Sequence, residues 1–146
     1  MLQKAGQSYG RHRIFHLPLQ SHEGRSITCL ALPDFFYGSI AVNEFGDVVI
    51  GFNGSGPSQF VSSYAVQGTT VSGITTFGEP LLLQAGVANY AVLQIFDSGR
   101  NRWGDYSATV VDPTDPFTFW TFQEWVSANN TWATQITQLR VAGNLM

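Results

Sequence analysis

The chain has 146 residues, of which 44% are hydrophobic and only 12% are charged, with a formal net charge of −3. This length predicts one domain over residues 1–146 with a core of its own, and the acidic balance disfavours a nucleic-acid partner. Cys29 is the only cysteine, which excludes an intrachain disulfide and a thiolate metal cluster. No apolar run approaches the length of a signal-peptide core or of a membrane span. We therefore expect no membrane partner and a cytoplasmic location for the chain as written.

Short apolar or alternating segments recur along the chain, and turn residues separate them every ~8–12 residues, which is typical of an all-β fold. A glycine turn at Gly46-Asp47 and a proline turn over residues 112–116 are the clearest boundaries. Residues 87–96 fit a short helix, a strand or a long loop equally well. The predicted strands are Ile14–Leu19, Ser26–Leu32, Ser39–Val42, Val48–Asn53, Ser62–Gln67, Glu79–Leu83, Tyr106–Val111, Thr118–Trp125 and Thr131–Val141.

An internal repeat divides the chain. Residues 37–43, which begin with Tyr37-Gly38, align with residues 103–112, which begin with Trp103-Gly104, if a short insertion is allowed. Each copy continues with an acid or amide turn, an aromatic strand and one further strand. The repeat predicts lead-in strands over residues 1–34 and two blade-like units over residues 35–85 and 100–142. We expect about two four-stranded antiparallel propeller-type blades, with a β-sandwich or a small barrel as the alternative.

Two segments carry a resemblance to a known family. They are "SIAVNEFGDVVIGFNGSGPSQFVSSYAV" and "GRNRWGDYSATVVDPTDPFTFWTFQEW". Both resemble the C-terminal blades of large secreted bacterial β-propeller proteins with sialidase-like, or BNR-like, repeats. The resemblance covers about residues 35–141 and implies a propeller fold, with a sialidase-like reaction as the associated activity. The chain departs from that family in being shorter than a closed ring of 4–8 blades. The aspartate box, hinted at in residues 43–47, lacks its closing tryptophan.

The resemblance also implies a candidate site, because the innermost strand of each propeller blade lines a central tunnel. Arg100, Arg102, Asp105 and Tyr106 would then stand near the tunnel mouth. An arginine pair can hold a carboxylate in bidentate fashion, while an aspartate and a tyrosine can supply an acid and a hydrogen-bonding group. The alternative is an ion pair between Arg102 and Asp105 that joins one blade to the next.

Glu124 is the second acidic candidate, because a glycosidase needs two carboxylates beside the scissile bond and Asp105 could be the other. An exposed acid at a strand end is the alternative interpretation of Glu124. Trp103 and Trp125 are candidate ligand-binding aromatics, since aromatic faces stack on sugar rings, although most aromatic side chains of such a chain must form its core.

Metal ligands are the third kind of candidate. Asp112 and Asp115 are hard oxygen ligands in one turn and could hold calcium, while turn formation by aspartate and proline explains the same residues without a metal. His12 and His16 would share a strand face, but no third ligand for zinc lies near them. We expect no other cofactor.

The function predicted from these residues is a non-catalytic carbohydrate-binding or interaction module. The alternatives are a sialidase-like hydrolase that uses Asp105 and Glu124 with the arginines, and a propeller fragment without a function of its own. Two blades form an open wedge with exposed apolar flanks, so we also expect copies of the chain to associate head to tail. A homotrimer with six blades is favoured over a tetramer with eight. A glycan or another small ligand is the other expected partner.

Overall fold

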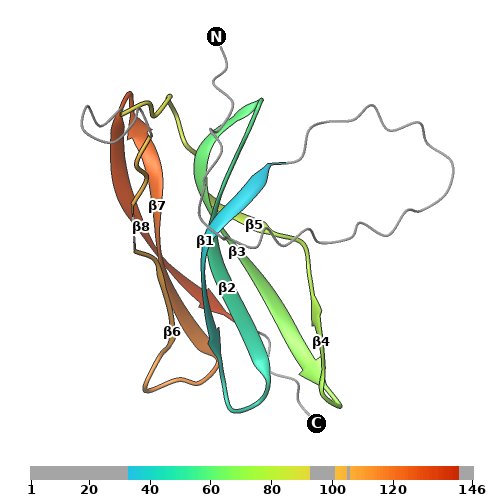
Figure 1. Cartoon of the computed structure of the whole chain (residues 1–146). Coiled ribbons are helices and arrows are strands. Elements are labelled where there is room, and N and C mark those ends of the chain that lie inside the picture. Colours follow the sequence, from blue (N-terminus) through green and yellow to red (C-terminus); the bar gives the residue numbers. More distant parts are fainter. Residues whose placement is uncertain (1–32, 93–100, 105, 142–146) are drawn as a thin grey trace, which may run out of the picture.

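The computed structural model describes residues 33–92, 101–104 and 106–141, and within this part the fold is all-β. No helix that could cross a membrane occurs among these residues. The strands are β1 (Asp34–Val42), β2 (Asp47–Gly56), β3 (Gln59–Val71), β4 (Ile74–Phe77), β5 (Leu81–Gln84), β6 (Ala108–Val111), β7 (Thr118–Ala128) and β8 (Thr131–Arg140) (Figure 1).

The strands form two antiparallel sheets, neither of which closes into a barrel. In sheet 1 the order is β1-β2-β3-β4, and β5 also pairs with β3. β4 pairs with residues 68–71 of β3 and β5 with residues 63–65, so the two short strands share the fourth position of the sheet. Sheet 2 has the order β6-β7-β8.

The turn between β1 and β2 shows how local chemistry sets the register. The side-chain oxygen of Asn43 accepts hydrogen bonds from the backbone N–H groups of Phe45 (3.0 Å) and Asp47 (2.8 Å). Gly46 has a φ of +83°, which a residue with a side chain rarely adopts. This closed turn places Val42 opposite Val48 in the ladder.

The two sheets pack face to face, with β1 beside β6, and β2 and β3 beside β7 (Figure 1). We call the faces in mutual contact the inner faces and the other two the outer faces. Val49 from sheet 1, Phe119 from sheet 2 and Val141, which directly follows β8, form a buried apolar cluster between the inner faces. A sandwich and a pair of neighbouring propeller blades share this arrangement.

A layer of hydroxyl and amide groups continues the contact beside the apolar cluster. The Ser39 hydroxyl lies 2.8 Å from that of Thr109, which lies 3.1 Å from that of Thr121. The amide nitrogen of Gln123 donates to Ser39 (3.1 Å) and Thr121 (3.0 Å). Gly51 leaves room for this layer, because a Cβ there would lie 2.0 Å from the Thr121 hydroxyl oxygen.

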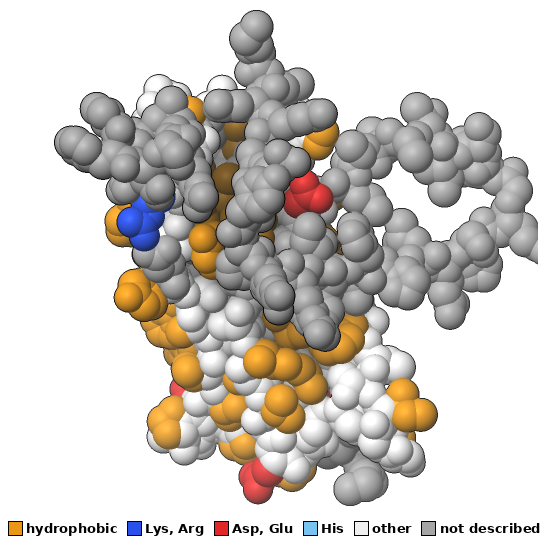
Figure 2. All heavy atoms as spheres, viewed as in Figure 1, with side chains coloured by type: hydrophobic (Ala, Val, Ile, Leu, Met, Phe, Trp, Pro, Cys, Tyr) orange, Lys and Arg blue, Asp and Glu red, His pale blue; other side chains and the backbone are white. Residues whose placement is uncertain are grey.

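The outer face of sheet 1 carries a separate aromatic cluster. Phe52 and Tyr64 pair across β2 and β3 and stack with an interplanar angle of 8°, and Phe35 packs edge-on against both. Charged side chains are sparse on the described surface shown in Figure 2, where hydrophobic and uncharged polar side chains predominate.

Most of the predicted strands that fall within the described residues are confirmed, with shifted ends. β4 was not predicted, and residues 87–92 form neither strand nor helix. The second blade-like unit has three strands in the described part, whereas we expected about four. The predicted strands Ile14–Leu19 and Ser26–Leu32, with Cys29 and the histidines, lie outside the described residues.

Candidate functional site

One buried asparagine ties the two sheets together at the end where β1 and β6 begin. Asn53 is only 2% exposed. Its amide nitrogen donates to the backbone carbonyls of Ser62 (3.2 Å) and of Glu124, and its side-chain oxygen accepts from the indole N–H of Trp103 at 3.0 Å. A single side chain thus fixes β2, β3, β7 and the segment over residues 101–104.

Trp103 is half-buried and lies against a second aromatic ring. The ring of Tyr90 stands perpendicular to the indole, with 5.0 Å between ring centroids. This edge-to-face geometry is the favoured one for aromatic pairs. We call Asn53, Tyr90, Trp103, Gly104 and Glu124 the Trp103 cluster.

The carboxyl group of Glu124 lies directly on the backbone of Gly104. A Cβ on Gly104 would be 1.7 Å from one carboxyl oxygen of Glu124, so only glycine fits there without displacing that side chain. The Oε2 atom of Glu124 is buried. Burial, and secondly the negative charge of Glu124, raise the pKa of Tyr90, so its hydroxyl stays protonated at neutral pH.

The structure brings two of the sequence-predicted residues together, namely Trp103 and Glu124. Arg102 precedes Trp103 and is exposed, and Tyr106 is 88% exposed just before β6. Trp125 is half-buried and, as the neighbour of Glu124 in β7, points to the opposite face of the strand.

Arg100 and Asp105 lie outside the described residues. The ion pair between Arg102 and Asp105, and the carboxylate pair of Asp105 with Glu124, therefore remain predictions. Sequence reasoning missed Asn53 and Tyr90. Asn53 lies next to Gly54 and two residues after Gly51 at the end of a predicted strand, and glycines in a strand often mark a place where another backbone approaches closely. Tyr90 lies in a segment without a periodic pattern.

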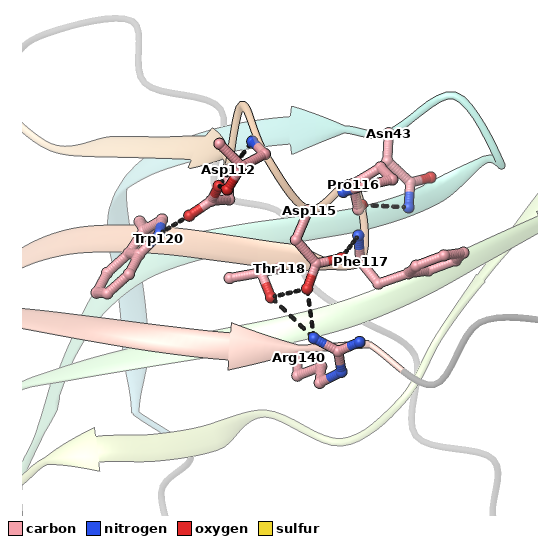
Figure 3. A network of polar contacts seen from close by, with 9 residues as sticks. Asn43, Asp112, Asp115, Pro116, Phe117, Thr118, Trp120 and Arg140 are labelled. Carbon is pink, nitrogen blue, oxygen red and sulfur yellow. Dashed lines mark hydrogen bonds and ion pairs between the residues drawn. The ribbon is translucent and has the colours of Figure 1, made fainter.

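In the candidate calcium turn, the carboxylate oxygens of both aspartates accept hydrogen bonds from groups of the protein itself (Figure 3). Asp112 accepts from the Thr114 backbone N–H (2.8 Å), the Thr114 hydroxyl (2.7 Å) and the Trp120 indole N–H (2.8 Å). The hydrogen bond from Trp120, followed by those from Thr114, lowers the pKa of Asp112 to about 2.

Asp115 is held in a similar way, by the Phe117 backbone N–H (3.1 Å), the Thr118 hydroxyl (2.9 Å) and the guanidinium of Arg140. These contacts, that of Thr118 first, lower the pKa of Asp115. Among the described residues, no group of three or more histidine, cysteine, aspartate or glutamate side chains could hold a metal ion. The contacts of Asp112 and Asp115 favour a role in forming the turn over a role in calcium binding.

A groove of about 330 Å³ lies between sheet 1 and the end of β8. Its walls are mainly aliphatic, with Val49, Leu81 and Leu139 among them, and its charged residues are Glu79 and Arg140. Arg140 is already paired with Asp115. The groove lacks the aromatic rings of the Trp103 cluster, which is therefore the better candidate for a ligand site.

A scan against protein-family models, a search of curated proteins and a search of solved structures each found no match to the chain. The resemblance to sialidase-like propeller blades therefore stays a prediction.

Proposed function

We propose that the chain is a non-catalytic module, built from two propeller-type blades, that binds a sugar or a similar polar ring compound. The observation that carries the proposal is the Trp103 cluster, which combines two aromatic rings with a carboxylate and a hydroxyl group. Aromatic rings pack on the C–H faces of sugars, and a few well-placed polar groups then fix the orientation of the ligand.

Exposed side chains near the cluster extend the same chemistry into solvent. The Ser107 hydroxyl donates to the backbone carbonyl of Tyr37 at 2.9 Å, so the start of β6 lies beside that part of β1. Tyr37 is 39% exposed and Tyr106 is 88% exposed, and Arg102 is exposed as well. All three side chains reach solvent near the cluster, whereas Trp103 is held in place by Asn53.

Two features support blades as the framework. The first sheet has four strand positions, and both sheets repeat the order of three consecutive antiparallel strands. In addition, β1 packs beside β6 and the turns of the two sheets lie at the same end, where Asn43 donates to the backbone carbonyl of Pro116, and neighbouring blades are arranged in this way.

Binding is favoured over hydrolysis by the position of Glu124. A general acid must reach the glycosidic oxygen of a bound sugar. One carboxyl oxygen of Glu124 is buried, and the carboxyl group packs against the backbone of Gly104. In this position Glu124 holds the Trp103 segment in place and is poorly placed to protonate a bound sugar.

The test is a panel of sialylated and unsialylated oligosaccharides, screened on an array and then titrated by calorimetry. We expect binding without release of free sugar, and a loss of about tenfold in affinity for Tyr106→Ser, which corresponds to roughly 1.4 kcal/mol of lost contact. The melting temperature should not change, because Tyr106 is almost fully exposed.

The matched control is Phe45→Ser, which removes an exposed aromatic ring from the turn at the other end of β1. It should leave the affinity unchanged. Absence of binding to the whole panel would refute the proposal, and release of free sugar would replace it with the hydrolase.

A further inference from the structure

β8 forms one edge of sheet 2, and in the described part of the chain only β7 pairs with it (Figure 1). The corresponding edge of sheet 1 is different, because β4 and β5 both pair with β3 there. Sheet 2 therefore lacks, among the described residues, the fourth strand position that sheet 1 has. Alternate residues of β8 direct their backbone N–H and C=O groups away from β7, and these groups are the donors and acceptors that a further strand needs.

The exposure of the side chains shows that this edge of β8 reaches solvent. Thr121 and Gln123 of β7 face sheet 1 and are fully buried. Their ladder partners on β8, Thr137 and Gln135, face the same way but are only half-buried. Solvent therefore reaches the side of β8 that points away from β7.

β8 also lacks the features that keep edge strands from pairing. The edge strands β4, β5 and β6 have only four residues each, and the register of β1 shifts between Phe36 and Ser39. β8 has ten residues, and its register with β7 is continuous from Trp132 to Arg140. Residues 131–139 include no charged residue, proline or glycine. A long, regular and uncharged edge strand of this kind is a template for pairing with another strand.

The sequence of β8 is complementary to itself in one antiparallel register. If Thr134 lies opposite Thr134 of a second copy, Trp132 of each copy lies opposite Ile136 of the other. Both side chains are on the outer face of sheet 2, where they are 53% and 55% exposed, and pairs of an aromatic and a β-branched side chain stabilise antiparallel strands. The register uses residues 131–137, so Arg140 lies beyond it and no like charges meet.

The outer face of sheet 1 offers much less free surface than this edge. Val48, Phe52, Tyr64 and Val66 on that face are only 5–8% exposed. The head-to-tail ring that we expected from the sequence would need this face, whereas pairing through β8 does not involve it. The edge of sheet 2 is therefore the better place for a contact between copies.

We propose that the chain forms a dimer in which β8 of one copy pairs antiparallel with β8 of another, about a two-fold axis at Thr134. The two three-stranded sheets then become one sheet of six strands, and backbone hydrogen bonds between the two edges supply the affinity. Both copies contribute the same residues to this contact, so the edge that forms it is used up and the association stops at two copies.

The test is the mass in solution, measured by light scattering after size-exclusion chromatography. The wild-type chain should give twice the 16.0 kDa of one copy. Thr134→Lys places two lysines opposite each other at the axis, so the mass should fall twofold, to that of the monomer. Thr76→Lys is the matched control, because Thr76 is an exposed threonine of the edge strand β4, and this variant should remain a dimer.

An exchange of charge distinguishes this strand pairing from other contacts between copies. Thr134→Glu alone should also be monomeric, and an equimolar mixture of the Thr134→Lys and Thr134→Glu chains should form a 1:1 dimer, because opposite charges then meet at the axis. A wild-type mass of one or of three copies, a dimer that survives Thr134→Lys, or a mixture that stays monomeric would overturn the proposal. Circular dichroism of each variant verifies that it is folded.

Discussion

Gly51 lies under the polar layer between the two sheets, and its missing side chain is a condition of that layer. A Cβ at this position would be 2.0 Å from the Thr121 hydroxyl, 2.5 Å from the Gln123 amide nitrogen and 2.9 Å from the Thr109 hydroxyl. All three partners are buried, so they cannot move aside without breaking their hydrogen bonds. The role of Gly51 is therefore steric.

We predict that Gly51→Ala lowers the free energy of unfolding by roughly 1–3 kcal/mol, the usual effect of overpacking a closed interior. Urea denaturation measures the change. Gly38→Ala is the control, because a Cβ there would meet only the Ile50 side chain, at 3.9 Å. A Gly51→Ala chain as stable as the Gly38→Ala chain would show that the sheets can separate freely at this point.

Gln123 shows why part of the interior could not be predicted. It is fully buried, and its amide nitrogen donates hydrogen bonds to the hydroxyl groups of Ser39 and Thr121. Its side-chain oxygen has no hydrogen-bond partner among the described residues. In the sequence it is one polar residue in an aromatic strand and looks like a solvent-facing position. Only the packing of the second sheet on the first reveals that it points inward.

At the scale of elements, the β6–β7 turn is held by two aspartates. The carboxylate of Asp112 accepts a hydrogen bond from the indole N–H of Trp120. The carboxylate of Asp115 accepts a hydrogen bond from the hydroxyl of Thr118 and forms an ion pair with the guanidinium of Arg140. Asn43 donates to the backbone carbonyl of Pro116 at 3.0 Å, so the turn of sheet 1 is tied to the turn of sheet 2 (Figure 3). Loss of the aspartate charges should loosen this end of the molecule.

Acid should therefore destabilise the fold. Hydrogen bonds, that of Trp120 first, hold the pKa of Asp112 at about 2, and the pKa of Asp115 is also lowered. An aspartate in an unfolded chain titrates near ~3.9. A group with a lower pKa in the folded state stabilises the fold above the unfolded pKa, and this contribution is lost as the pH falls through the folded pKa.

We predict that the melting temperature of the wild-type chain falls between about pH 4 and about pH 2, and that Asp112→Asn makes this fall shallower while lowering the melting temperature at pH 7. Thermal denaturation followed by circular dichroism across this pH range is the measurement. Asp34→Asn, at an exposed position of β1, serves as the control. An equally steep fall in the Asp112→Asn chain would argue against the turn as the acid-sensitive element.

The elements themselves were largely predictable, because alternation and turn chemistry are local properties. The strand around Val48–Asn53 and the turn at Gly46 are examples. β4 was missed because its four residues are all exposed and carry no alternation of burial. In the candidate site, Trp103 and Glu124 were predicted from residue type, whereas Asn53, which holds Trp103 in place, depends on a contact between residues 50 positions apart.

At the scale of the whole molecule, the contact between the sheets decides whether they fold as one unit. Val49 contributes from sheet 1 and Phe119 from sheet 2 to one buried cluster, and Asn53 bonds to both sheets. Neither sheet has an independent core on its inner face. Separation of the sheets would expose this cluster and leave the polar layer without its partners, so the separated state should be scarcely populated.

We predict a single cooperative unfolding transition. All four tryptophans lie between residues 103 and 132, so their fluorescence follows sheet 2 and the Trp103 segment, whereas far-ultraviolet circular dichroism follows both sheets. The two signals should change at the same urea concentration when they are measured at one protein concentration. Phe119→Ala should move both midpoints together and cost about 3–5 kcal/mol. Two separated midpoints would mean that each sheet is stable alone, and the contact between the sheets would then be an interface between two independent units.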